Sequence, residues 1–166
     1  MTATWTVLIA ALSSLGGVAL GSFLEPIKLA AARRTRIRER MTELCAQLID
    51  AATMTRSRSL LINQLHRRVT HGDRQVSDED LRTADAAYWD ARTELRRAAM
   101  LIQLFAPADV AEQAMIVRHS DYRLRRIRME IGDHIEKPPD ALIKASNELD
   151  AAVLRFIELA RSHTTR

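Results

Sequence analysis

Two charged side chains, Arg58 and Asp121, interrupt sequence stretches that are otherwise apolar at helical spacing. Counting from the expected distal helix ends at residues 71 and 131, with a rise of about 1.5 Å per residue, places the two charges at heights that differ by about 5 Å. They could therefore meet in the core as an ion pair that fixes the helix register. The alternatives are that both side chains are exposed, or that they form a functional polar site.

The remaining reactive side chains form no recognisable catalytic or metal-binding set. The histidines fit neither an HExxH motif, nor a Cys/His zinc spacing, nor a Glu-x-x-His pair. His66, His71 and His134 would gather with Asp133 and Glu136 at the distal end of a helical bundle, either as solvated helix ends or as a metal site. No GxSxG motif, phosphate-binding loop or dinucleotide fingerprint occurs. We therefore expect no catalytic residue, no metal site and no cofactor.

A group of five arginines and a single cysteine complete the candidates. The arginines Arg118, Arg123, Arg125, Arg126 and Arg128 lie near the end of an expected helix. The acidic start of an adjacent helix, at residues 78–80, favours internal charge complementarity. A docking face for an acidic partner and a nucleic-acid contact are the alternatives. Cys45 is expected to be a small buried side chain, and one cysteine excludes an intramolecular disulfide.

Beyond residue 25 the sequence predicts only helices. A heptad-like apolar stripe runs from Ile37 to Val69, and Gly72 supplies a stop. Residues 77–80 (Ser-Asp-Glu-Asp) form a capping box that opens a second helix, which ends before Pro107. A third helix follows to about Ile131, and a fourth begins at Pro139. Because the connections are short, we expect an antiparallel up-down four-helix bundle.

The first part of the chain has the pattern of a membrane anchor. Residues 5–24 contain no charged side chain, and a helix of this length spans about 30 Å, the thickness of a hydrocarbon core. Pro26 is expected to end this helix or to begin the next one. The alternatives are a signal peptide cleaved after Ala32 and a buried helix of a soluble protein. Against the signal peptide, no basic residue precedes the apolar run, and the run is too long.

The basic residues on one side of this run set its expected orientation. None precedes the run, whereas six follow it: Lys28, Arg33, Arg34, Arg36, Arg38 and Arg40. By the positive-inside rule, the N-terminus lies outside and the remaining chain lies in the cytoplasm, at the inner (plasma) membrane. Acidic and basic residues balance from Met41 onward, so the excess charge of +4 resides beside the anchor. The expected electrostatic partner is the anionic inner leaflet and not a nucleic acid.

Small residues recur every four positions within the anchor, at Ser13, Gly17 and Gly21. Such a stripe lets two membrane helices approach closely, which favours a homodimer or packing on another membrane protein. The alternative is that small residues are simply common in membrane helices.

The expected fold is therefore all-α, with a single N-terminal transmembrane helix, a long second helix and a bundle. The expected parts are a transmembrane anchor at 1–25, a basic juxtamembrane helical stalk at 26–43 and a cytoplasmic helical bundle at 44–166. This organisation predicts a single-pass, membrane-anchored interaction or scaffold protein that is not an enzyme. The alternatives are a sensor or enzyme with a ligand or metal site in the bundle, and an effector that acts on the membrane itself.

Overall fold

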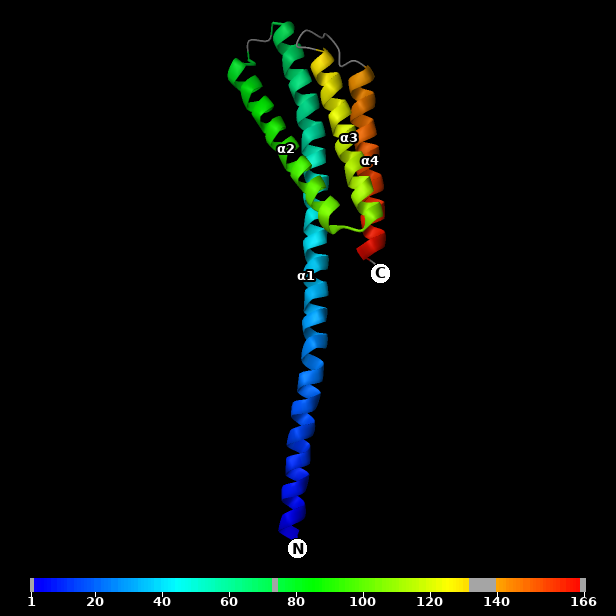
Figure 1. Ribbon diagram of the computed structural model, residues 1–166. Helices are drawn as coiled ribbons and strands as arrows, with labels where there is room; N and C mark the ends of the chain where they lie inside the picture. Colours follow the sequence, from blue (N-terminus) through cyan, green and yellow to red (C-terminus); the bar gives the residue numbers. More distant parts are fainter. Residues whose placement is uncertain (1, 73–74, 132–139, 165–166) are drawn as a thin grey trace. The chain divides into compact units, whose positions relative to one another are not determined.

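The computed structural model describes the backbone of residues 2–72, 75–131 and 140–164, and the side chains of residues 29–72, 75–130 and 140–163. In this part of the chain every regular element is a helix, which confirms the all-α class (Figure 1). The helices are α1 (Thr2–Thr70), α2 (Asp78–Phe105), α3 (Ala108–Ile131) and α4 (Asp140–Thr164).

The chain divides into two compact units, Met1–Arg40 and Met41–Arg166. The first unit belongs to α1, which continues through Pro26, so the predicted helix boundary at that residue is wrong. A proline removes one backbone hydrogen bond, but the turns on either side can still form. The predicted transmembrane run at residues 5–24 lies outside the described side chains. Within the described ones, no helix combines the length and the apolar character needed to cross a membrane.

The second unit is a helical bundle, as predicted, in which successive helices alternate in direction (Figure 1). Pairwise contacts give the order of the helices around it. Arg56 of α1 donates a hydrogen bond to Ser146 of α4 over 2.9 Å, and Gln113 of α3 donates one to the Ala152 carbonyl of α4 over 3.2 Å. Arg92 of α2 contacts α3. Each helix therefore packs against its sequence neighbour, with α4 closing the ring against α1.

The helix ends follow the chemistry that the sequence predicted. The Ser77 hydroxyl accepts the Asp80 backbone N–H over 3.2 Å, and the Asp80 carboxylate accepts the Ser77 backbone N–H over 2.8 Å. These bonds to Ser77 lower the pKa of Asp80 and satisfy two donors at the start of α2. Gly72 ends α1 with a φ of 77°, a left-handed conformation that glycine adopts at little cost. Ala106 is extended before Pro107, as expected.

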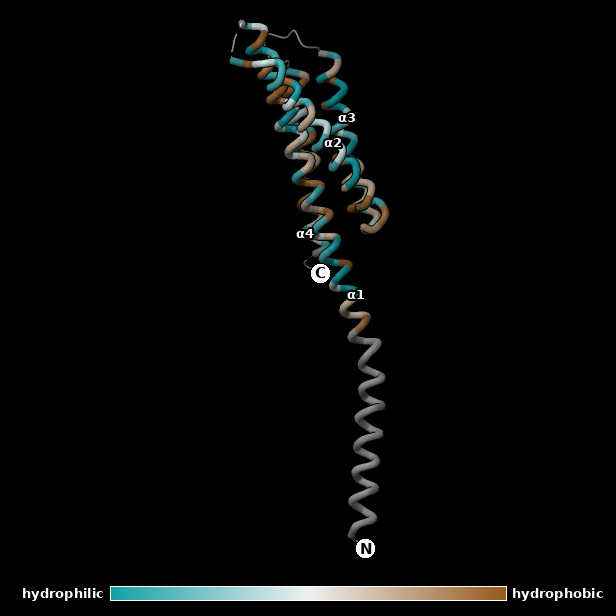
Figure 2. The backbone as a smooth tube through the Cα atoms, turned by 90° about the vertical axis from the view of Figure 1, so that its left-hand side faces the viewer, coloured by the Kyte–Doolittle hydropathy of each residue, from teal (hydrophilic) through white to brown (hydrophobic). Residues whose placement is uncertain are grey.

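The bundle has one main apolar core and a smaller separate cluster. All four helices contribute to the core, through residues that include Leu48, Leu95, Leu124 and Phe156. Hydropathy accordingly alternates along each described helix (Figure 2). The smaller cluster joins α1 and the first half of α2, through Ile62, Ala84 and Tyr88.

The predicted apolar stripes are buried only in their middle sections. Ile37, Val69 and Phe105, which lie at or beyond the ends of these stripes, are exposed. A heptad pattern predicts which face of a helix turns inward, but a residue is covered only where a neighbouring helix is present.

Candidate functional site

Asp121 of α3 is buried and forms an ion pair with Arg92 of α2. The Arg92 Nε donates to both carboxylate oxygens, over 3.0 Å and 3.3 Å. Only 2% of Asp121 is exposed, and Arg92 is also largely covered. The two helices are thus joined by a charged contact within their interface.

The prediction that Asp121 pairs with Arg58 is wrong. Arg58 is half-buried on α1, and within the described residues no hydrogen bond or ion pair joins it to Asp121. Counting helix rise gave similar heights for the two residues, but α1 and α3 lie diagonally across the bundle. Arg92 lies on the neighbouring helix and reaches the carboxylate first. Its position four residues after the buried Tyr88 is the sequence signal that could have identified it.

Aromatic rings extend this charged contact along the interface. The Trp89 ring lies near two guanidinium groups, with its centroid 5.5 Å from the Arg92 Cζ and 5.2 Å from the Arg125 Cζ. The Arg128 Cζ lies 4.2 Å from the Tyr88 centroid. Such cation–π contacts contribute about 0.5–2 kcal/mol each, and more where water is excluded.

Asp85 completes the network at the distal side. Its carboxylate accepts the Trp89 Nε1–H over 3.1 Å and an Arg128 Nη2–H over 3.0 Å. We call this set the arginine–aromatic seam; it comprises Asp85, Tyr88, Trp89, Arg92, Asp121, Arg125 and Arg128. The seam joins α2 to α3 through ion pairs, hydrogen bonds and cation–π contacts, whereas the main core of the bundle is apolar.

Burial dominates the electrostatics of the seam. It raises the pKa of Asp121, although the charges of Arg92, Arg125 and Arg118 act in the opposite direction. Burial and the Asp121 charge likewise raise the pKa of Tyr88. A close ion pair would by itself lower the pKa of Asp121. Desolvation therefore outweighs the attraction, as is common for buried pairs.

Four buried polar atoms lack a hydrogen-bond partner among the described residues: Ser59 Oγ, Tyr88 Oη, Arg125 Nε and Arg128 Nη1. Two of them are donors on the seam arginines, which carry more N–H groups than the surrounding acceptors can satisfy. An unpaired buried donor costs about 1–3 kcal/mol. Among the described residues, the seam therefore holds more buried polar atoms without a hydrogen-bond partner than the rest of the bundle.

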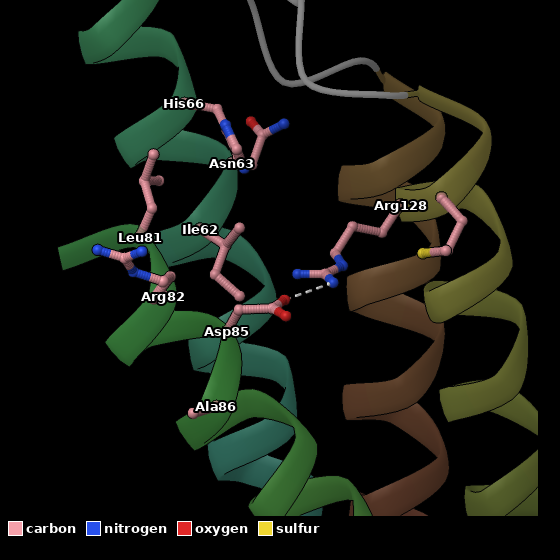
Figure 3. A pocket seen from close by; sticks show the side chains of 9 residues that line it. Ile62, Asn63, His66, Leu81, Arg82, Asp85, Ala86 and Arg128 are labelled. Carbon is pink, nitrogen blue, oxygen red and sulfur yellow. Dashed lines mark hydrogen bonds and ion pairs between the residues drawn. The ribbon is translucent and has the colours of Figure 1, made fainter. Parts of the chain in front are cut away.

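A cleft of about 620 Å³ opens beside the seam, between α1, α2 and α3 (Figure 3). Its lining residues are Ile62, Asn63, His66, Leu81, Arg82, Asp85, Ala86, Arg128 and Met129. This cleft could not be predicted from the sequence, although two of its lining residues, His66 and Arg128, are among the candidates that the sequence offers for other reasons.

Three of the five arginines in the group on α3 form ion pairs within the protein, but not with the residues expected. Arg128 pairs with Asp85, Arg123 with Glu148 over 3.0 Å, and Arg126 with Glu130 over 2.7 Å. The predicted acidic partners at residues 78–80 are used locally: Asp80 caps α2, and Glu79 pairs with Arg82 over 3.1 Å. Because those acids lie in the first turn of α2, their own helix satisfies them.

The other candidates are spread over the chain. Ser13, Gly17, Gly21 and Lys28 lie outside the described side chains, as do Asp133, His134 and Glu136. The five arginines from Arg33 to Arg40 are exposed, as lipid contact requires. Cys45 is half-buried against the core, and burial raises the pKa of its thiol. In the part of the chain that is described, no group of three or more His, Cys, Asp or Glu could hold a metal ion.

No family model matches this chain, and neither a curated protein nor a solved structure matches it. Function must therefore be inferred from the residues and their arrangement.

Proposed function

We propose that this protein is a single-pass, membrane-anchored helical interaction protein and not an enzyme. The observation that carries this proposal is the asymmetry of the first 40 residues. Residues 5–24 have no charge, no basic residue precedes them, and six follow before Met41. This pattern is typical of an anchor whose N-terminus lies outside and whose helical bundle lies in the cytoplasm.

The basic segment gives the anchor a lipid preference. Each Lys or Arg held near an anionic leaflet contributes about 1 kcal/mol of attraction, within a Debye length of the surface. The side chains of Arg33, Arg34 and Arg36 are exposed, which is compatible with headgroup contact. Since charges balance from Met41 onward, the attraction is confined to the segment next to the anchor.

Cysteine accessibility tests the orientation directly. In a Cys45→Ser background, Thr2→Cys should react with a membrane-impermeant maleimide in intact cells, and Ser162→Cys should react only after lysis. Replacing the five arginines between residues 33 and 40 by glutamine should produce mixed orientations, because the charge bias is removed. Recovery of the unaltered chain in the soluble fraction, or labelling of Ser162→Cys in intact cells, would contradict the proposal.

The proposed interaction includes a second copy of the chain or another membrane protein, packed against Ser13, Gly17 and Gly21. We expect Gly17→Leu and Gly21→Leu to reduce crosslinked dimers in membranes several-fold, since leucine prevents close helix approach. Gly16→Leu is the matched control, because it makes the same change on a different helix face. Equal dimer yields from Gly16→Leu and Gly17→Leu would remove the stripe from the interface.

A ligand-binding sensor is the second candidate function, and the cleft beside the seam is the observation that favours it. A membrane-anchored bundle with a cytoplasmic ligand site could couple occupancy of that site to a partner. The chemistry of the cleft decides which ligand would fit.

A further inference from the structure

The cleft lies where α1 and α2 are not joined by the main core. α2 is inclined to α1 (Figure 1), and among the described residues the apolar contact between their distal halves is the smaller cluster of Ile62, Ala84 and Tyr88. The volume of about 620 Å³ falls within the range of about 300–1,000 Å³ that is typical of small-molecule sites. Helices α1, α2 and α3 each contribute side chains to its wall.

Asn63 is the first sign that the cleft has an occupant. Only 8% of this residue is exposed, and its side chain lines the cleft. A carboxamide offers two donors and one acceptor, yet no described residue forms a hydrogen bond with it. The Asn63 amide atoms are not among the fully buried atoms that lack a partner, so they are open to the cleft, where an apolar residue would instead extend the cluster around Ile62. The unpartnered amide therefore points to a ligand with a polar group.

Arg128 supplies the charge. Its side chain is 13% exposed and reaches from α3 across the cleft toward Asp85 on α2 (Figure 3). Nη2 donates to Asp85, while Nη1 has no acceptor among the described residues. A small rotation of the guanidinium would let a carboxylate beside Asp85 accept from Nη1. Arginine is well suited to such a contact, because its planar donors match a carboxylate.

The remaining lining limits the ligand class. Ile62, Leu81 and Met129 give the cleft apolar walls that would cover a hydrocarbon body. Asp85 lies beside Arg128 and would repel a doubly charged phosphate more strongly than a single carboxylate. A neutral hydroxyl or carbonyl oxygen could also accept from the Arg128 Nη1, but the charge-assisted hydrogen bond to a carboxylate is about twice as strong. We propose that the cleft between α1, α2 and α3 binds a small apolar monocarboxylate, with its charged end between Asn63 and Arg128.

Titration of the full-length chain in detergent micelles with hexanoate tests this proposal, with hexanol and hexyl phosphate as matched probes. We expect hexanoate to raise the unfolding temperature in the millimolar range, and the other two probes to do so less. Asn63→Leu should weaken hexanoate binding about tenfold or more, because a hydrogen bond to a charged ligand is lost. The same variant should be more stable without ligand, since an amide that no described residue pairs with is replaced by an apolar side chain beside the Ile62 cluster.

Controls separate a binding role of Asn63 from a structural one. Asn147→Leu makes the same change at an exposed position of α4 and should leave hexanoate binding unaltered. Asn63→Ala removes the amide without adding volume, so it reports on binding if leucine does not fit. No shift with millimolar hexanoate, hexanoate binding by Asn63→Leu and Asn63→Ala that equals binding by the unaltered chain, or stronger effects of hexanol or hexyl phosphate would each overturn the proposal. Because maleimide labelling reads orientation alone, failure of this site is distinguishable from failure of the membrane anchor.

Discussion

Replacing Arg92 by methionine is expected to destabilise the bundle by about 3 kcal/mol at neutral pH. Methionine preserves much of the side-chain volume, but it leaves the buried Asp121 carboxylate without its guanidinium partner. Breaking a buried ion pair on one side typically costs about 3–5 kcal/mol, and the partial exposure of Arg92 places the expectation at the lower end. Loss of the contact between Arg92 and the Trp89 ring adds to the effect. Urea unfolding followed by far-UV circular dichroism measures it.

The destabilisation should depend on pH with a definite sign. Burial already raises the pKa of Asp121 in the folded chain, and removing Arg92 raises this pKa further. A carboxyl group whose pKa is higher in the folded chain than in the unfolded chain stabilises the folded state at low pH. This stabilisation is lost as the pH rises through the pKa of the folded chain. The difference in stability between Arg92→Met and the unaltered chain should therefore be largest near pH 7 and shrink toward pH 4.

Two further variants separate the ion pair from a general effect of losing an arginine. The double variant Arg92→Met/Asp121→Leu should recover most of the lost stability, because neither member of the pair is left buried without its partner. Arg96→Met alters an exposed arginine on the same helix and should change stability by less than about 0.5 kcal/mol. If Arg92→Met costs no more than Arg96→Met, or if its cost does not vary with pH, the buried pair does not contribute as described.

Local chemistry is the part of this fold that could be predicted from the sequence. The capping box at Ser77 and Asp80, the stop at Gly72 and the break before Pro107 depend on neighbouring residues alone. The inward faces were also predictable, since Leu48, Leu95 and Leu149 occupy the expected stripes and are buried. Helical spacing fixes which side chains share a face, whatever the partner helix is.

The pairing of charges could not be predicted because it depends on the arrangement of helices around the bundle. Asp121 was assigned to Arg58 from height alone, yet Arg92 on the adjacent helix reaches it. The cleft was missed for a related reason. Its lining depends on the inclination of α2, and no residue pattern within α2 specifies that angle. Asn63 and Asp85 belong to no sequence pattern, and Arg128 is only one of a group of arginines, until three helices bring them together.

Replacing Phe156 by alanine is expected to cost about 3–5 kcal/mol of unfolding free energy. Phe156 is fully buried in the main core, where residues of all four helices surround it. Alanine would remove most of a large apolar side chain and leave a cavity that a rigid helical interface closes only in part. Because the typical free energy of folding of a domain is about 5–15 kcal/mol, this one substitution could approach the limit of stability.

Phe105→Ala is the matched control. It makes the same change at the end of α2, where Phe105 is 65% exposed. It should change stability by less than about 0.5–1 kcal/mol, because little of its surface leaves water on folding. Urea unfolding of both variants, followed by far-UV circular dichroism, gives the comparison. Equal losses would contradict the assignment of Phe156 to the core.

The core lies entirely within Met41–Arg166, so the loss from Phe156→Ala should be the same in the full-length chain and in a chain that begins at residue 27. A smaller loss in the shortened chain would mean that residues before 27 affect the packing around Phe156.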